Sequence, residues 1–177
     1  MAGSLKKLDE VTLSGATADV TLGDSKWDAS YNVYYVTFDG VKVSADDSLA
    51  VRVLASGSPQ TAVNYQESVM YAKSDTNSTV GGSVGLGQGD ATATIDSGVA
   101  ASSGNGHMFL YAFNNSAEYS YMTVDSVHMQ YATNSGRGFM KSIIHTVAAA
   151  NDGILFKCNT TSNNLTAGTF KLFGISK

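Results

Sequence analysis

The chain ends in Ala167-Gly168-Thr169-Phe170-Lys171-Leu172-Phe173-Gly174-Ile175-Ser176-Lys177, a run rich in the residues that favour strands. Because successive side chains of a strand point to opposite faces, Phe170 and Leu172 share one face, and Lys171, Phe173 and Ile175 share the other. Apolar residues on both faces predict a strand covered on both sides. We expect Phe170 and Leu172 in the core, where each contributes about 1.5–3 kcal/mol, and Phe173 and Ile175 at a contact with another subunit.

The composition excludes several classes of partner and of stabilising bond. At 177 residues the chain is long enough for one domain that needs no disulfide or metal to fold. A charged fraction of 15% and a net charge of −4 give no electrostatic reason to bind nucleic acid or an anionic membrane. Cys158, the only cysteine, excludes an intrachain disulfide and is expected to be a small buried hydrophobe. We find no membrane-spanning apolar run and no signal peptide, so export by a standard signal is not expected.

Strand patterns dominate the rest of the chain. They cover residues 32–38, 49–54, 107–113, 121–131, 139–147 and 154–158. Residues 63–73 fit a helix face as well as a strand, and we favour the strand because the rest of the chain is β. About eight to ten strands without a clear helical period predict an all-β, antiparallel β-sandwich of jelly-roll type.

Three more local expectations follow from the pattern. Asp39-Gly40 predicts a hairpin turn that leads into residues 41–43. Residues 154–158 are expected to pair with the closing strand. The glycine-rich residues 79–94 lack the Gly-Lys-Ser/Thr element of a phosphate-binding loop and are expected to form a flexible loop or a glycine-weakened strand.

The chain divides into an N-terminal arm, residues 1–8, and a single jelly-roll domain, residues 9–177. The arm has small residues followed by a lysine pair, and it is either a frayed terminus or a segment that docks on a neighbouring subunit. On the second interpretation, the interface residues are Leu5, Lys6, Lys7, Leu8, Phe173 and Ile175.

No catalytic or metal-binding motif is found. His107, His128 and His145 lack the spacing of a helical metal site, and no Cys/His cluster exists. No Gly-x-Ser-x-Gly elbow occurs. We therefore predict no cofactor, no metal and no enzymatic activity. Two alternatives stay open: a calcium ion in an Asp-bearing loop, and a hydrolytic enzyme that depends on one of the three histidines.

Nine tyrosines are spread over several of the expected strands. Tyrosine suits a surface that is dry on one side and wet on the other, so it favours a subunit interface or a platform on which sugar rings stack. Ordinary strand propensity explains the tyrosines equally well. Trp27, Tyr31 and Tyr34 are the candidate glycan platform, although a lone tryptophan in a turn-rich stretch is more often a loop anchor.

Gly138-Phe139, His145-Thr146-Val147, Asn151-Asp152-Gly153-Ile154-Leu155-Phe156 and the closing run together carry a resemblance to a known family. They resemble the C-terminal portion of small jelly-roll virion structural proteins of tailed bacteriophages, including marine ones. The resemblance implies two packed antiparallel sheets, assembly into a particle in the host bacterial cytoplasm, and no catalytic motif.

The expected function is that of a capsid decoration or cement protein. It would bind the assembled lattice of the major capsid protein, or other virion proteins, and would form a homo-oligomer, with a trimer favoured. Neither nucleic acid nor a membrane is an expected partner. The alternative is a receptor- or glycan-binding domain associated with a tail fibre or spike.

Overall fold

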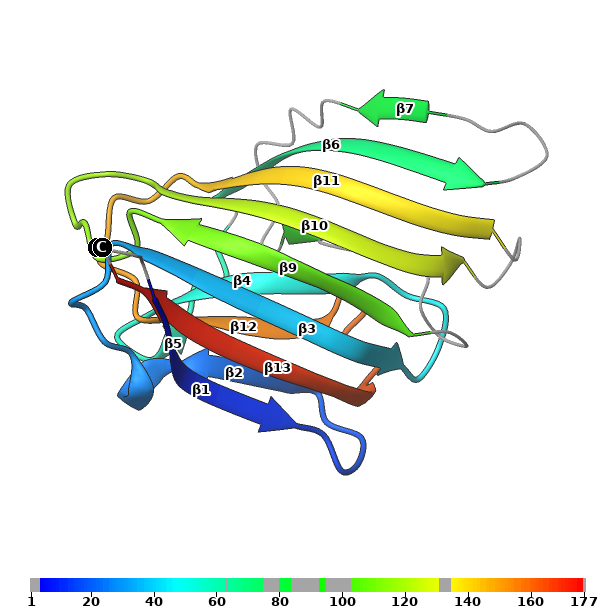
Figure 1. The fold of residues 1–177 in the computed structure, drawn as a ribbon, viewed down its shortest axis with the longest axis horizontal. Coiled ribbons are helices and arrows are strands. Elements are labelled where there is room, and N and C mark those ends of the chain that lie inside the picture. The colour runs from blue at the N-terminus through cyan, green and yellow to red at the C-terminus, as the bar shows by residue number, and fades with distance from the viewer. Residues whose placement is uncertain are drawn as a thin grey trace.

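The computed structural model describes residues 4–62, 64–74, 80–83, 93–94, 103–130 and 135–176. In these residues, thirteen strands and one short 3-10 helix form two antiparallel sheets packed face to face (Figure 1). The protein is an all-β sandwich of jelly-roll type, which confirms the fold predicted from sequence. Ten of the strands have five or more residues, which matches the upper end of the predicted number. Three shorter strands bring the described total to thirteen, which is more than the predicted eight to ten.

The large sheet has eight strands. In spatial order they are β1 (Leu5–Thr12), β13 (Leu165–Ile175), β3 (Val33–Val43), β9 (Gly104–Tyr111), β10 (Ser120–Gln130), β11 (Ser135–His145), β6 (Tyr65–Ser74) and β7 (Val80–Ser83). It forms the front layer in Figure 1. The strand interpretation of residues 63–73 is confirmed by β6, which begins at Tyr65; residue 63 lies outside the described residues.

The small sheet lies behind the large one. Its strands are β2 (Asp19–Gly23), β12 (Gly153–Cys158), β4 (Leu49–Ala55) and β5 (Ser58–Pro59), and β8 (Ala93–Thr94) also pairs with β4. The 3-10 helix η1 (Asp24–Lys26) follows β2. Most of the glycine-rich stretch of residues 79–94 lies outside the described residues, which include only β7 and β8 from it.

The core fills the space between the two sheets. Phe156 of the small sheet packs against Phe38 and Phe170 of the large sheet, with ring centroids 6.0 and 4.9 Å apart. All three rings are fully buried. Cys158 is also buried, and burial raises the pKa of its thiol to about 11. The expected role of Cys158 as a small buried hydrophobe fits this position.

The closing strand β13 alternates as the sequence predicts. Phe170 and Leu172 are fully buried between the sheets, and Phe173 and Ile175 are half-buried on the opposite face. The predicted strand neighbour was wrong, because β13 pairs with β1 and β3 rather than with β12. The apolar side chains of β12 meet β13 across the sandwich instead, and alternation alone does not distinguish a face-to-face contact from an edge-to-edge one.

The expected arm boundary after residue 8 differs from the structure, in which the edge strand β1 begins at Leu5. Leu5 lies opposite Ile175, and Lys7 lies opposite Phe173. The buried Asp9 side chain ties β1 to the small sheet. Its carboxylate accepts hydrogen bonds from the Gly23 backbone N–H at 3.1 Å and from the Lys26 ammonium at 2.5 Å.

The predicted hairpin at Asp39-Gly40 is wrong, because β3 runs through this dipeptide without turning back. Gly40 has a φ of 63°, and the register with β9 shifts between Phe38 and Val41. The Gly40 N–H donates a hydrogen bond to the Asn105 side chain at 2.8 Å. The left-handed glycine therefore makes a bulge within one strand rather than a turn between two.

Within the described residues, no helix is long and apolar enough to span a membrane.

Candidate functional site

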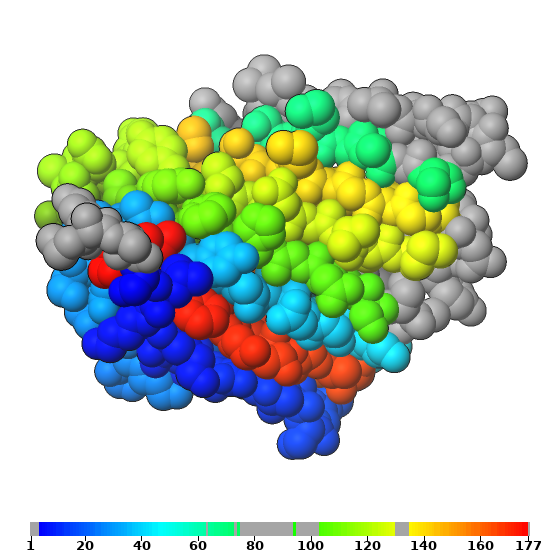
Figure 2. Space-filling model, in the orientation of Figure 1, coloured from blue at the N-terminus to red at the C-terminus, as the bar shows by residue number. Residues whose placement is uncertain are grey.

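The candidate site is the face of the large sheet that points away from the small sheet, here called the outer face. Figure 2 views this face, where side chains from β1, β13, β3, β9, β10 and β11 lie side by side. Residues directly opposite each other in paired strands share a face, so the strand register defines rows of side chains that run across the sheet. One of these rows is apolar, and the surface beside it holds a cluster of rings and a groove.

The apolar row crosses six strands near the end of the sheet that holds Ser4 and Ser176. Ser4 and Ser176 are hydrogen-bonded at this end. We call the row the apolar band, and its members in spatial order are Leu5, Ile175, Val33, Tyr111, Tyr121 and Ile144. Leu5, Tyr111 and Tyr121 are 56%, 37% and 43% exposed, so the band presents apolar surface to solvent.

Aromatic rings lie beside the band. Tyr35 is at the centre of this ring cluster, with centroid separations of 5.0 Å to Phe109, 5.6 Å to His107 and 6.1 Å to Phe173. Phe109 also stacks on Tyr111 of the band at 6.3 Å. Such ring pairs add stability beyond the area that they bury. The cluster fixes the side chain of Tyr35 next to a hollow in the sheet surface.

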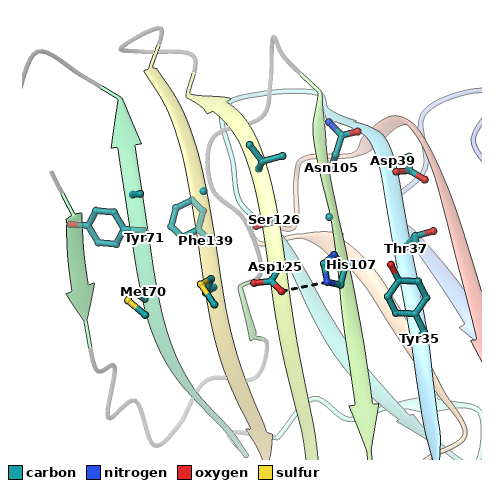
Figure 3. A pocket seen from close by; sticks show the side chains of 15 residues that line it. Tyr35, Thr37, Asp39, Met70, Tyr71, Asn105, His107, Asp125, Ser126 and Phe139 are labelled. Atoms are coloured by element: carbon teal, nitrogen blue, oxygen red, sulfur yellow. Dashed lines mark ion pairs between the residues drawn. The ribbon is translucent and has the colours of Figure 1, made fainter. Parts of the chain in front are cut away.

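That hollow is a groove of about 680 Å³ that crosses β3, β9, β10, β11 and β6. We define the groove by Tyr35, His107, Asp125, Gly138, Met140 and Met70, all of which line it. Figure 3 shows Tyr35 and His107 at one side and Met70 at the other. A groove of this volume is within the range of small-molecule sites in proteins.

His107 and Asp125 meet in the middle of the groove. The two residues are direct cross-strand partners on β9 and β10, and the His107 Nε2 atom lies 3.4 Å from the Asp125 Oδ2 atom. Figure 3 shows the imidazole and the carboxylate pointing toward each other. Both side chains are open to solvent, with exposed fractions of 37% and 50%. The pair can therefore exchange hydrogen bonds with a ligand as well as with each other.

The structure brings some of the predicted interface residues together. Leu5 and Ile175 are neighbours in the apolar band, and Phe173 belongs to the ring cluster. Lys7 lies opposite Phe173 and pairs with Glu10 at 2.5 Å, which lowers the pKa of Glu10.

The other two predicted interface residues lie elsewhere. Lys6 points away from the outer face and lies 3.7 Å from the Asp28 carboxylate. Leu8 packs against the core at an irregularity of β1. The six residues therefore do not form one continuous surface.

The residues of the predicted glycan platform pack against the fold and against each other. Tyr34 is fully buried, and the Trp27 ring stacks on it at a centroid distance of 3.8 Å. The Trp27 indole N–H donates to the Asn114 side chain at 2.8 Å. Burial raises the pKa of Tyr34 to about 12. Trp27 is therefore the loop anchor that the sequence offered as the alternative. Tyr31 is half-buried and packs over Gly174.

The three histidines do not form a common site. His107 is on the outer face, whereas His128 and His145 are buried on the inner face. His128 lies parallel to the Phe139 ring at 5.4 Å, and His145 lies 5.0 Å from the Tyr65 ring. Burial lowers the pKa of His145. Within the described part of the chain, no group of three or more His, Cys, Asp or Glu residues is arranged to hold a metal ion.

No protein-family model and no curated protein matches this chain. Among solved structures, the chain is similar to the marine PL-14 alginate lyase from Aplysia kurodai, with 13% identity over 88% of this chain and 73% of that one and a TM-score of 0.25. It is also similar to a chain in the structure of infectious bursal disease virus Gx strain, with 9% identity over 98% of this chain and 40% of that one and a TM-score of 0.15.

A third similar structure is the alginate lyase from Alteromonas sp.272, with 11% identity over 89% of this chain and 76% of that one and a TM-score of 0.13. At these TM-scores the likenesses carry no conclusion about this chain. Its function is therefore argued from its own residues.

Proposed function

We propose that this protein is a non-enzymatic structural protein of a tailed-bacteriophage particle, a decoration or cement protein that binds the assembled lattice of the major capsid protein. The apolar band carries the proposal. It places six apolar side chains in one row across six strands, and three of them are well exposed. Contiguous exposed apolar surface of this kind marks a contact with another protein.

The chemistry of the band suits such a contact. Tyr111 and Tyr121 lie side by side in the band, and tyrosine is enriched at protein interfaces because its ring is apolar and its hydroxyl is polar. The band lies on paired strands rather than on loops, so its side chains lose little conformational freedom on binding. Binding to the assembled lattice and not to its separate subunits would stabilise the shell by mass action.

The resemblance carried by the sequence also supports a place in a phage particle. The residues that resemble phage virion proteins include the closing strand β13, which supplies Ile175 to the band and Phe173 to the ring cluster. We expect a homo-oligomer on the lattice, with a trimer favoured, because a closed symmetric oligomer repeats one contact on a symmetric shell.

The band is tested by adding purified protein to capsids that lack it and measuring occupancy. Tyr121→Asp places a charge within the band, and Thr123→Asp places the same charge two residues along the same strand and face but outside the band. We expect at least about a tenfold weaker affinity, equivalent to about 1.4 kcal/mol, for Tyr121→Asp only. Equal occupancy of wild type and Tyr121→Asp would show that the band does not bind the capsid.

A further inference from the structure

We propose that the groove on the outer face is a binding site for a short neutral saccharide. This site is separate from the apolar band, and the proposal does not depend on the protein's being a capsid component. It also differs from the Trp27, Tyr31 and Tyr34 platform expected from sequence, because none of those three residues lines the groove.

Gly138 forms the floor of the groove, which stays open because glycine has no side chain. Gly138 belongs to a cross-strand row on the outer face, between Val127 of β10 and Ala72 of β6. A Cβ atom at Gly138 would have the Ser126 carbonyl oxygen as its nearest neighbour, at 3.9 Å. The space next to Gly138 is therefore open to a Cβ atom, and a larger side chain there would extend into the groove.

One wall of the groove is aromatic and the opposite wall is aliphatic. Tyr35 is held in place by its contacts with Phe109 and Phe173, so its ring is ordered before a ligand arrives. Met70 and Met140 of the opposite wall are 53% and 59% exposed. The C–H face of a sugar ring is apolar and suits both surfaces, and a pre-ordered ring lowers the entropic cost of binding.

Polar groups with free hydrogen-bonding capacity lie between these walls. In the part of the chain that the structure describes, the side chains of Thr37 and Asp39 make no hydrogen bond. Among the described residues, the Asp125 carboxylate pairs with His107 alone, at 3.4 Å. The side-chain oxygen of Asn105 accepts a hydrogen bond from the Gly40 N–H, which leaves the side-chain NH2 group to donate to a ligand. Carboxylates that accept and an amide that donates match the hydroxyl groups of a sugar.

The charge of the groove selects among saccharides. Two carboxylates, Asp39 and Asp125, line it, and no lysine or arginine is among its described lining residues. A uronate, sulfate or phosphate group would be repelled by the carboxylates and would find neither lysine nor arginine among the described lining residues. The geometry therefore points to a neutral glycan rather than to an acidic polysaccharide or a nucleic acid.

The test titrates the isolated full chain with five neutral tetrasaccharides, cellotetraose, laminaritetraose, mannotetraose, xylotetraose and chitotetraose, and with an alginate tetrasaccharide as the anionic comparator. Calorimetry or NMR can detect binding as weak as a millimolar dissociation constant, which is the affinity that we expect of a single groove. We expect at least one neutral tetrasaccharide to bind more tightly than the anionic one. Gly138→Val should weaken that binding at least about tenfold, because the new side chain occupies the groove.

Two more variants make the test specific. Ser142→Val changes the same strand and the same face outside the groove, and should bind as the wild type does. Asp125→Asn retains the shape and should weaken binding severalfold through loss of a charged acceptor. Thermal unfolding should be unchanged within error for Gly138→Val, since valine favours strands. No binding of any neutral tetrasaccharide, preference for the alginate tetrasaccharide, or equal binding by wild type and Gly138→Val would each overturn the proposal.

Discussion

The ring of Tyr31 lies directly on the backbone of Gly174, in the space that a Cβ atom would occupy. A Cβ built on Gly174 would overlap three ring carbons of Tyr31. Gly174 is buried in the closing strand between Lys6 of β1 and Tyr34 of β3. Gly174 therefore has a packing role, because it lets the loop before β3 lie on the end of the large sheet.

Gly174→Ala is expected to destabilise the protein by about 1–3 kcal/mol, because the methyl group displaces the Tyr31 ring from a packed site. Urea unfolding measures the loss. Gly15→Ala is the matched control, since a Cβ at Gly15 meets no atom within 4 Å. If Gly174→Ala and Gly15→Ala unfold at the same urea concentration, the ring contact does not stabilise the fold.

Asn114→Ala is expected to loosen the loop that carries Trp27. The Asn114 side chain accepts from the Trp27 indole N–H at 2.8 Å and donates to the Tyr31 carbonyl at 2.6 Å and to the Tyr34 hydroxyl at 2.8 Å. Losing these bonds should cost about 1–3 kcal/mol.

Trp27 is the only tryptophan, so its fluorescence reports the change directly. A red shift of the emission in Asn114→Ala is the expected result. Asn115→Ala removes a neighbouring exposed amide whose oxygen accepts a single bond from the Ala117 N–H, and should leave the emission unchanged. Identical spectra for both variants would contradict the anchoring role of Asn114.

Asp9→Ala is expected to release β1 from the small sheet. The Asp9 side chain is buried and accepts from the Gly23 N–H and the Lys26 ammonium, and hydrogen bonds to charged groups contribute about 1.5–3 kcal/mol each. Hydrogen exchange at the β1 amides should therefore accelerate more than exchange at the amides of β10.

Glu10→Ala is the control for this variant, because the Lys7–Glu10 pair is at the surface and contributes little. Exchange in β1 that is equally fast in wild type and Asp9→Ala would show that the terminal strand behaves as a free arm.

The stability of the protein is expected to fall as the pH drops through about 6.5. Burial lowers the pKa of His145 in the folded state below its usual value of 6.5. Between the folded and the unfolded pKa, the unfolded state binds more protons, so stability is lost on acidification through this window. Urea unfolding at about pH 7.5 and about pH 5.5 measures the loss. His145→Leu should lose less stability over this interval than the wild type does. Equal losses would show that His145 does not cause the pH dependence.

The sequence predicted those features that depend on one strand at a time. The alternation in β13 placed Phe170 and Leu172 in the core and Phe173 and Ile175 on the other face, because side-chain period is a local property. The strand nature of β6 followed from the β character of its surroundings.

Features that depend on strand pairing could not be predicted in this way. Asp39-Gly40 has the composition of a hairpin turn, but the pairing of β3 with β13 and β9 makes it a bulge. The groove depends on the register that places Gly138 beside Val127, which no single segment reveals. Trp27 resembled a surface platform because sequence does not show that its partner Tyr34 is buried.

The proposed place on the capsid is tested most directly by the copy number of this protein in purified particles of the phage that, on this proposal, encodes it. A stained gel gives its molar ratio to the major capsid protein. A decoration protein on the lattice predicts a ratio of the same order as that of the shell subunits. Absence from the particle, or the few copies expected of a tail component, would contradict the proposed function.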